Sequence, residues 1–409
     1  MRCRQEGAAL LSVVVVIAVI ATTAADFAYN SEVDLAASAN ARDDLRAHYL
    51  SRSAMNLSRL LLRVQERFIE PNRQFFGGMD LQIADYAPFL ISAFNNREGA
   101  EMLGSLIGVD TAAIKGLGVD VGSFDLEMES LDGRLNVNCG GGLNTGDPKV
   151  ARFAAALAAM MLPTRYNRLF EEPDENGQYA DRLEVMRALV DWADQDNVMF
   201  GSSAAEDYRY NAGKDPYEIK NQYYDTLEEL RLVKGIDDDF MAAFGDSLTV
   251  YGDCKVNVNL ADAPMIAALI VQNASVPNDP ALTWENLSLL TRYVLQIRGT
   301  LNGFPDAKAF IQAVETPTAA VAVAFAWDPA AAQQQGGNLP PVNGVKLNPT
   351  PLNESMVVGG ARRIWQLTAT AKVGRIQKKI KAVWDMKLIS MQSSKYNLGP
   401  GGYLYWREE

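Results

Sequence analysis

Acidic side chains crowd one stretch near the middle of the chain and could together hold a cation. The carboxylates that we predict as ligands are Asp191, Asp194, Asp196, Glu206 and Asp207. Three of them fall within about one and a half helical turns, and so much like charge costs free energy unless a cation neutralises it. Hard oxygen ligands at short spacing suit Ca²⁺. The stretch is not an EF-hand, because the glycine and closing glutamate of that loop are misplaced when counted from Asp194.

The same acidic stretch has a second interpretation, in which a helix ends there and its carboxylates are solvated. Aromatic residues interleave the acids: Trp192, Tyr208 and Tyr210. They indicate a partly buried loop, where unpaired carboxylates are costly. The residues therefore point to a calcium site and leave the solvated helix end as the alternative.

Two cysteines of the folded part, Cys139 and Cys254, could form a disulfide. The third, Cys3, lies in the N-terminal leader described below. An even pair in an oxidising compartment is typical of a bridge, and the alternative is two separate buried thiols.

Catalytic and nucleic-acid-binding functions find little support in the composition. The single histidine, His48, lies on a helical stripe. A Ser-His-Asp arrangement therefore lacks its general base, and a histidine-rich zinc site lacks its ligands. The chain has no GxxxxGK[ST] nucleotide loop, and its net charge of −12 repels phosphate backbones. We therefore expect no enzyme and no nucleic-acid partner, with a membrane-anchored periplasmic hydrolase built on a carboxylate pair as the enzymatic alternative.

An uncharged apolar segment near the N-terminus must position everything that follows. It covers residues 8–25 behind Arg2 and Arg4, and as a helix it would be about 27 Å long, close to the thickness of a bilayer core. The arginines hold the N-terminus in the cytoplasm and send the rest of the chain to the far side. The alternatives are a secretory signal cleaved after Ala25 and a plain signal anchor.

The helical pattern does not stop at residue 25. No proline or glycine follows until Pro71, and apolar residues recur at three- and four-residue spacing as far as Phe68. We expect one helix of about sixty residues, roughly 90 Å long, membrane-spanning in its first third and amphipathic afterwards.

A short leader ending in Gly7, followed by an apolar helix that continues into an amphipathic stem, resembles the N-terminus of type IV pilins and pseudopilins. The resemblance implies that a prepilin peptidase cuts after Gly7 and that Ala8 becomes the N-methylated first residue. Most members carry Glu at the fifth mature position, whereas this chain has Ser12 there. In this it resembles the K-type minor pseudopilin family of type II secretion systems.

The remaining chain predicts an α+β fold in which the long pilin helix packs on a small antiparallel sheet. We expect a β-hairpin near 119–138 around Asp132-Gly133, mainly helices from 147 to 318, a strand at 320–327, and a closing hairpin near 362–388. Hairpins alone are marginally stable, so the strands should form one sheet with the helices inserted between them. The predicted parts are a leader (1–7), a membrane and stem helix (8–70), a first pilin-like part (71–146), a helical insertion (147–318), and closing strands with a tail (319–409).

The resemblance to the K-type family carries functional expectations. It implies a minor pseudopilin that caps the pseudopilus tip and helps initiate assembly with the I and J minor pseudopilin types. The protein would cross the bacterial inner membrane once, with its bulk in the periplasm. Calcium binding is known in the family, so the ligand role falls on the five acids named above. The alternative within the pilin class is the tip minor pilin or adhesin of a type IV pilus.

Overall fold

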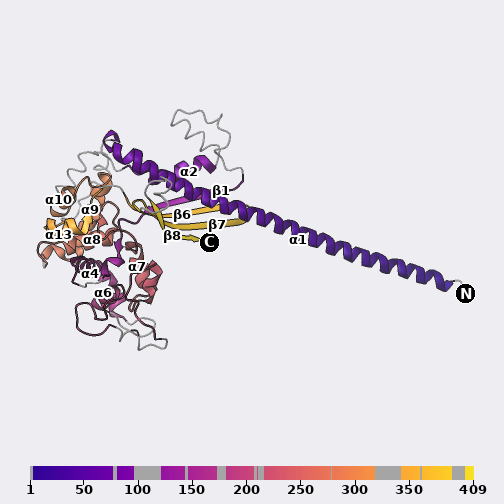
Figure 1. Cartoon of the computed structure of the whole chain (residues 1–409), viewed down its shortest axis with the longest axis horizontal. Helices are drawn as coiled ribbons and strands as arrows, with labels where there is room; N and C mark the ends of the chain where they lie inside the picture. The colour runs from indigo at the N-terminus through magenta and orange to yellow at the C-terminus, as the bar shows by residue number, and fades with distance from the viewer. Residues whose placement is uncertain are drawn as a thin grey trace.

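One long helix projects from a folded body in the computed structural model (Figure 1). The N-terminus lies at the far end of this helix, and the body gathers around its other end. The structure describes residues 3–76, 81–95, 121–142, 146–172, 181–206, 210, 216–277, 279–317, 342–359, 362–388 and 401–409.

The long helix is α1, Cys3–Val64, which confirms the predicted helix of about sixty residues. Its first part is apolar enough and long enough to cross a membrane, and that stretch is exposed throughout. A π-helical turn (Gln65–Ile69) and a 3₁₀ segment (Glu70–Phe76) follow, and the backbone leaves helical geometry at Asn72. The helix runs this far because no proline interrupts it before Pro71.

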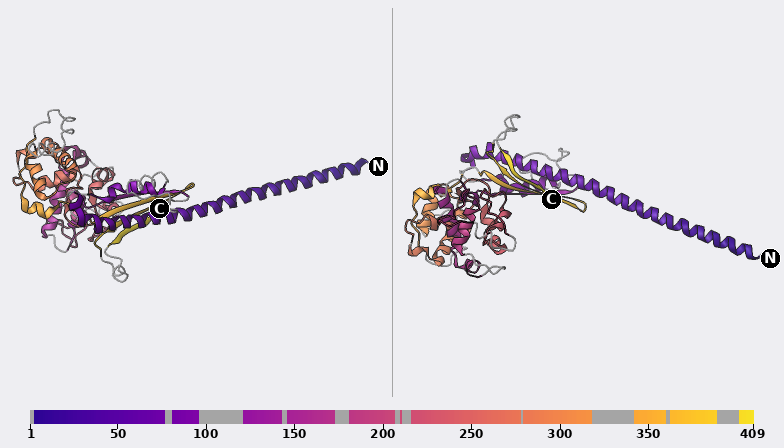
Figure 2. Two further views of the ribbon diagram at one scale, coloured as in Figure 1. Left: turned by 90° about the horizontal axis from the view of Figure 1, so that it is seen from above. Right: turned by 60° about the horizontal axis from the view of Figure 1, so that its bottom comes forward.

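The second half of α1 packs against one face of a four-stranded antiparallel sheet (Figure 2). Its strands, in the order in which they pair, are β1 (Ser123–Ser130), β6 (Ile364–Val373), β7 (Ile376–Asp385) and β8 (Gly402–Glu408). Alternate residues such as Leu126 and Leu367 are buried against Met55 and Leu62 of the helix. The period of two in the strands and the helical period of α1 together build this core.

The closing hairpin is confirmed as β6 and β7, which pair from Ile364–Asp385 to Val373–Ile376. Gly374 forms the turn with φ of 58°, a conformation that glycine adopts without strain. Two short helices, η3 (Ile83–Tyr86) and α2 (Ala87–Asn95), lie beside α1 and β1. The strand expected at 320–327 lies outside the described residues.

A helical body with its own hydrophobic core lies between β1 and β6 in sequence. Its helices are η5 (Val137–Gly140), α4 (Pro148–Met161), η6 (Thr164–Tyr166), α5 (Asn167–Glu171), α6 (Arg182–Asp191), η8 (Leu227–Leu232), α7 (Asp238–Phe244), η9 (Gly245–Ser247), α8 (Ala263–Gln272), η10 (Pro280–Leu282), α9 (Trp284–Thr300), α10 (Ala307–Glu315) and α13 (Pro349–Ser355). Two short parallel pairs join β2 (Leu135–Asn136) to β3 (Leu248–Thr249) and β4 (Val256–Asn257) to β5 (Met356–Val357). The core reaches from Leu135 to Met356, beyond both predicted limits at 147 and 318.

Most helices of the body begin at an acidic or amide cap that local sequence supplies. Asp147, Asp181, Asp237, Asp262 and Asp306 each accept a hydrogen bond from a backbone N–H of the first turn. Such caps satisfy donors that the helix leaves unpaired, and they fix where these helices begin.

The predicted hairpin near 119–138 is wrong in its second strand. β1 forms as expected but pairs with β6, and residues 135–140 enter the helical body as β2 and η5. Asp132 explains the change of direction, because its carboxylate accepts hydrogen bonds from the backbone N–H groups of Arg363 and Ile364. That carboxylate fixes the turn to the start of β6, so the chain cannot fold back along β1.

Arg363 joins the sheet to the helical body at the same place. Its guanidinium donates to both carboxylate oxygens of Asp385 at 2.8–2.9 Å and to Asp253 at 2.8 Å. Asp385 ends β7, whereas Asp253 belongs to a loop of the helical body, next to Cys254. These charge-assisted bonds raise the pKa of Arg363 and connect the two bodies through one side chain.

Candidate metal centre

The acidic stretch begins where α6 ends. Asp181 and Glu184 form a capping box at the start of this helix, and α6 ends at Asp191. The N–H of Asp194 still donates to the carbonyl of Val190, at 3.0 Å, so the chain turns tightly before it leaves the helix axis. This turn places the next two aspartates on one side of the loop.

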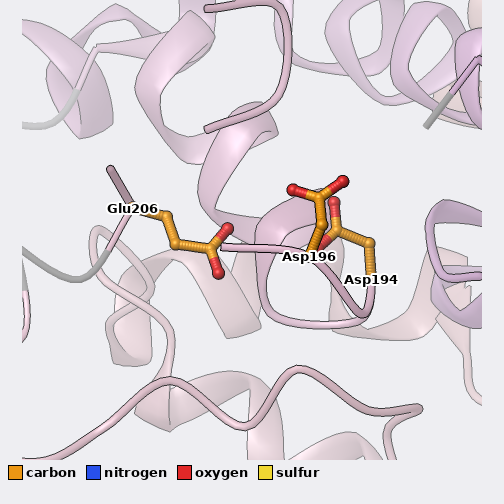
Figure 3. Close-up of side chains that lie close together, drawn as sticks. All are labelled: Asp194, Asp196 and Glu206. Atoms are coloured by element: carbon orange, nitrogen blue, oxygen red, sulfur yellow. The ribbon is translucent and has the colours of Figure 1, made fainter. Parts of the chain in front are cut away.

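The turn and a returning segment bring three carboxylates together (Figure 3). One oxygen each from Asp194, Asp196 and Glu206 lies within 4.8 Å of the others. A bridge between Val198 and Ala205 closes the intervening loop, and Glu206 therefore approaches from the side opposite the turn. Two segments separated by ten residues thus supply one set of hard oxygen donors.

Asp191 and Asp207, the other predicted ligands, have different places. Asp191 is buried beside the cluster, and its Oδ1 accepts a hydrogen bond of 2.7 Å from the N–H of Phe200. It therefore anchors the loop that carries Glu206 back to the turn. Asp207 lies outside the described residues.

Asp194 carries the test of whether a cation fits here. Its side chain is 1% exposed, and neither carboxylate oxygen accepts a hydrogen bond from the described residues at normal geometry. Burial, together with the charges of Asp196 and Glu206, raises its pKa to about 8, and the backbone N–H of Asp196 offsets this in part. A buried carboxylate among like charges is stabilised by a metal ion, so the residues present fit Ca²⁺.

Aromatic side chains pack beside the turn, which agrees with the partly buried loop that the interleaved pattern predicted. Trp192 packs on Tyr210 and Tyr217, with ring centroids 5.8 and 6.4 Å apart. Its indole N–H donates to Glu229, which Lys220 also contacts at 2.8 Å. The sequence pattern does not indicate Lys220 or Glu229, because no local periodicity relates Trp192 to a carboxylate 37 residues away.

If Ca²⁺ occupies this cluster, as proposed below, its binding is expected to weaken as the pH falls below about 8. Asp194 must lose its proton before it can ligate, and its pKa is raised to about 8. If one proton leaves per ion bound, the apparent dissociation constant rises about tenfold for each pH unit below that value. Isothermal titration calorimetry at about pH 6, 7 and 8 measures the dependence, and an affinity that stays constant across this range contradicts it.

The metal-free protein should show the corresponding trend in stability. Because the folded-state pKa of Asp194 lies above its ordinary value of 3.8, its contribution to stability is fully present below about pH 4. That contribution is lost as the pH rises towards 8, where the buried carboxylate becomes charged beside Asp196 and Glu206.

The remaining predicted site residues lie away from the cluster. Cys139 and Cys254 form a disulfide that closes a span of 115 residues, with Cys254 on the surface. Gly7 and Ala8 are part of α1, and Ser12 donates to the carbonyl of Ala9 on the same helix. None of them takes part in the acidic centre.

Comparisons with known proteins agree on one family. A model of the family described as type II secretion system (T2SS), protein K, matches residues 133–253. Type II secretion system protein K of Pectobacterium carotovorum subsp. carotovorum is 27% identical over 304 residues, which are 71% of this chain and 80% of that protein. The Pseudomonas aeruginosa protein of the same name is 26% identical over 273 residues, 66% of this chain and 69% of that protein.

The chain is thus similar to the type II secretion system protein K family, through a family model over residues 133–253 and through relatives over about two thirds of its length. The matched range of the K-family model contains Cys139 and the whole acidic centre. Among solved structures, the chain is similar to a protein in the crystal structure of the GspK-GspI-GspJ complex from the enterotoxigenic Escherichia coli Type 2 Secretion System. That match has a TM-score of 0.42 and 14% identity, and covers 71% of this chain and 81% of the other.

Proposed function

We propose that this protein is a K-type minor pseudopilin that caps the tip of the type II secretion pseudopilus and helps initiate its assembly. The observation that carries the proposal is α1, one uninterrupted helix that is apolar and exposed in its first part and packed on a sheet in its second. The apolar part of α1 can hold a subunit of this shape in a membrane before assembly. The same helix can later pack against other subunits in a filament.

The anchor would sit in the bacterial inner membrane, crossing it once. Arg2 and Arg4 would keep the N-terminus in the cytoplasm, and the sheet and helical body would lie in the periplasm. A prepilin peptidase would cut after Gly7 and Ala8 would then be methylated. An oxidising periplasm suits the disulfide between Cys139 and Cys254.

The stem offers an apolar surface for other minor pseudopilins, of the I and J types. On the side of α1 away from the sheet, Leu35, Tyr49 and Leu60 are 72%, 60% and 57% exposed. Large apolar side chains repeated along a helix face fit a partner helix better than they fit water. The stems of sister subunits are the partners that the similarity to the K-type family suggests.

The helical body would act as the cap. It lies at the end of α1 opposite the N-terminus, beside the sheet in each view (Figure 2). A bulky body at that end leaves no room for a further subunit to stack above it in a filament. This supports a place at the tip, where the protein is added first.

Ca²⁺ would stabilise the turn that begins at the end of α6. Asp194, Asp196 and Glu206 would hold the ion, and Asp191 and Asp207 complete the set of acids proposed for this site. Bound there, the cation would neutralise a buried cluster and fix the loop that the Val198–Ala205 bridge closes.

The mass of the mature N-terminal peptide tests the pilin class directly. We expect a peptide that begins at Ala8 and carries one added methyl group. A chain that begins at Asp26 would instead show a cleaved secretory signal and would contradict the proposal. Affinity capture of the full-length protein from cells should then recover other minor pseudopilins, and a Tyr49→Arg, Leu60→Arg variant should recover them at least tenfold less.

A further inference from the structure

Arg59 is a cation of the stem helix that lies against aromatic rings. It belongs to the half of α1 that packs on the sheet, and its guanidinium carbon lies 5.0 Å from the ring centroid of Trp384 in β7 and 5.9 Å from that of Tyr403 in β8. Its Nε is buried and donates no hydrogen bond within the described part of the chain. Burial also raises the pKa of Tyr403, which the charge of Arg59 offsets in part, so this corner of the molecule is poorly solvated.

The acidic side chain that β8 directs at the stem binds other residues of α1. Glu408 lies 3.5 Å from both His48 and Arg52. Among the residues that the structure describes, no carboxylate forms an ion pair with Arg59. A charge in a poorly solvated position costs free energy unless an anion pairs with it, so this position fits a carboxylate from another molecule.

β8 is an edge strand, and within the described residues it pairs only with β7. Glu409 and Lys379 exchange two backbone hydrogen bonds at the end of this strand pair. Because hydrogen-bonded and non-hydrogen-bonded pairs alternate in antiparallel strands, the N–H and C=O groups of Trp406 and Glu408 point away from β7. An edge of this kind can accept a further strand.

Exposed apolar side chains lie along the same edge. Leu404 and Trp406 are 40% and 36% exposed, and the ring of Trp406 packs on Tyr403 with centroids 4.8 Å apart. Tyr403 in turn contacts Arg59, so the open edge, the rings and the cation form one surface where β8 meets α1. Aromatic and arginine side chains are enriched at protein interfaces, which is the use that this surface fits.

We propose that this surface docks an extended, acidic segment of a neighbouring minor pseudopilin, which pairs with the open edge of β8 and places a carboxylate on Arg59. The inference rests on the proposed function and adds where on this chain a neighbour binds and which chemistry it brings. Main-chain hydrogen bonds to the edge give affinity for a strand, and the charge-assisted bond to Arg59 selects a strand that is acidic at the matching position.

Arg59→Met tests the docking by affinity capture of the full-length protein, with the recovered minor pseudopilins quantified. Methionine keeps contact with the two rings and removes the charge, so the isolated protein should melt within about 2 °C of the wild type or above it. Recovery should fall about tenfold, because a charge-assisted bond across the interface is lost. Arg168→Met, at an exposed ion-paired position of α5, is the matched control and should change neither quantity.

Trp406→Pro and Trp406→Ala separate strand pairing from side-chain packing in the same capture experiment. Both variants lose the indole ring, but only proline removes the backbone N–H that points away from β7, and proline is tolerated at such an edge position. We expect the proline variant to recover several-fold less of the neighbouring subunits than the alanine variant. Equal recovery by the two variants would contradict the strand pairing.

The remaining outcomes distinguish this inference from the function on which it rests. Wild-type recovery by Arg59→Met would overturn the docking and leave the proposed function standing. A loss of recovery accompanied by a fall of more than about 5 °C in the melting midpoint would make Arg59 a structural residue, which also overturns the docking. If the wild-type protein itself captures no minor pseudopilin, the proposed function fails and the inference fails with it.

Discussion

Chelation of Ca²⁺ is expected to lower the thermal unfolding midpoint of the full-length protein by about 5–10 °C at pH 8. An ion present at about 100 times its dissociation constant adds about 2.7 kcal/mol of stability. For a domain of about 150–250 residues, 1 kcal/mol shifts the midpoint by about 2–4 °C. Without the ion, the carboxylate of Asp194 is buried beside the like charges of Asp196 and Glu206. Scanning calorimetry with Ca²⁺ and with chelator measures the difference.

The Asp194→Asn variant should be more stable than the wild-type protein in chelator and less stable than it in Ca²⁺. In chelator it should melt above the wild-type protein at pH 8, because it removes a buried charge that burial disfavours. In Ca²⁺ it should melt below the wild-type protein, because a ligand is lost. Asp239→Asn, at an exposed position in α7, is the control and should change neither midpoint by more than about 1–2 °C. If Asp194→Asn destabilises the protein equally with and without Ca²⁺, the residue is a structural one.

Removing the disulfide should cost the folded protein about 2–5 kcal/mol of unfolding free energy. The bridge closes a span of 115 residues. Without the bridge, the unfolded chain gains conformational entropy, and this gain is larger for a longer span, so the folded state becomes less stable relative to the unfolded state. It also fixes the loop that carries Asp253, whose carboxylate binds Arg363 at the junction with the sheet. Urea unfolding of the Cys139→Ser, Cys254→Ser double variant measures the loss.

The matched control for the disulfide, measured on the chain that retains its leader, is Cys3→Ser. This variant keeps the bridge, so it should unfold at the wild-type urea concentration, and a reductant should destabilise it as it does the wild type. The double variant should not respond to the reductant. A wild-type midpoint in the double variant would show that the bridge contributes nothing to stability.

The acidic turn shows how far spacing alone can lead. The sequence placed Asp191, Asp194 and Asp196 near a helix end, because the helical period there is strong and Asp181 caps the helix. It could not tell Asp194, which is buried among like charges, from Asp191, which holds the N–H of Phe200. That difference depends on which backbone returns to meet each carboxylate.

The second strand of the predicted hairpin fails for a related reason. Alternating residues and an Asp-Gly pair indicate a local hairpin, and both features are present around Asp132. The carboxylate of Asp132 instead binds the backbone of Arg363, 231 residues further along the chain. A local sequence pattern cannot predict a competing interaction with a residue so far along the chain.

The sequence by itself determined the long N-terminal helix, the mainly helical character of the body and the closing hairpin around Gly374. These features depend on side chains within a few residues of one another, through periodicity, capping and turn geometry. The tertiary structure alone decided that β1 pairs with β6, that Cys139 meets Cys254, and that Asn221 reaches the acidic turn. Each of these contacts joins segments far apart in the chain, and packing of the whole body selects them.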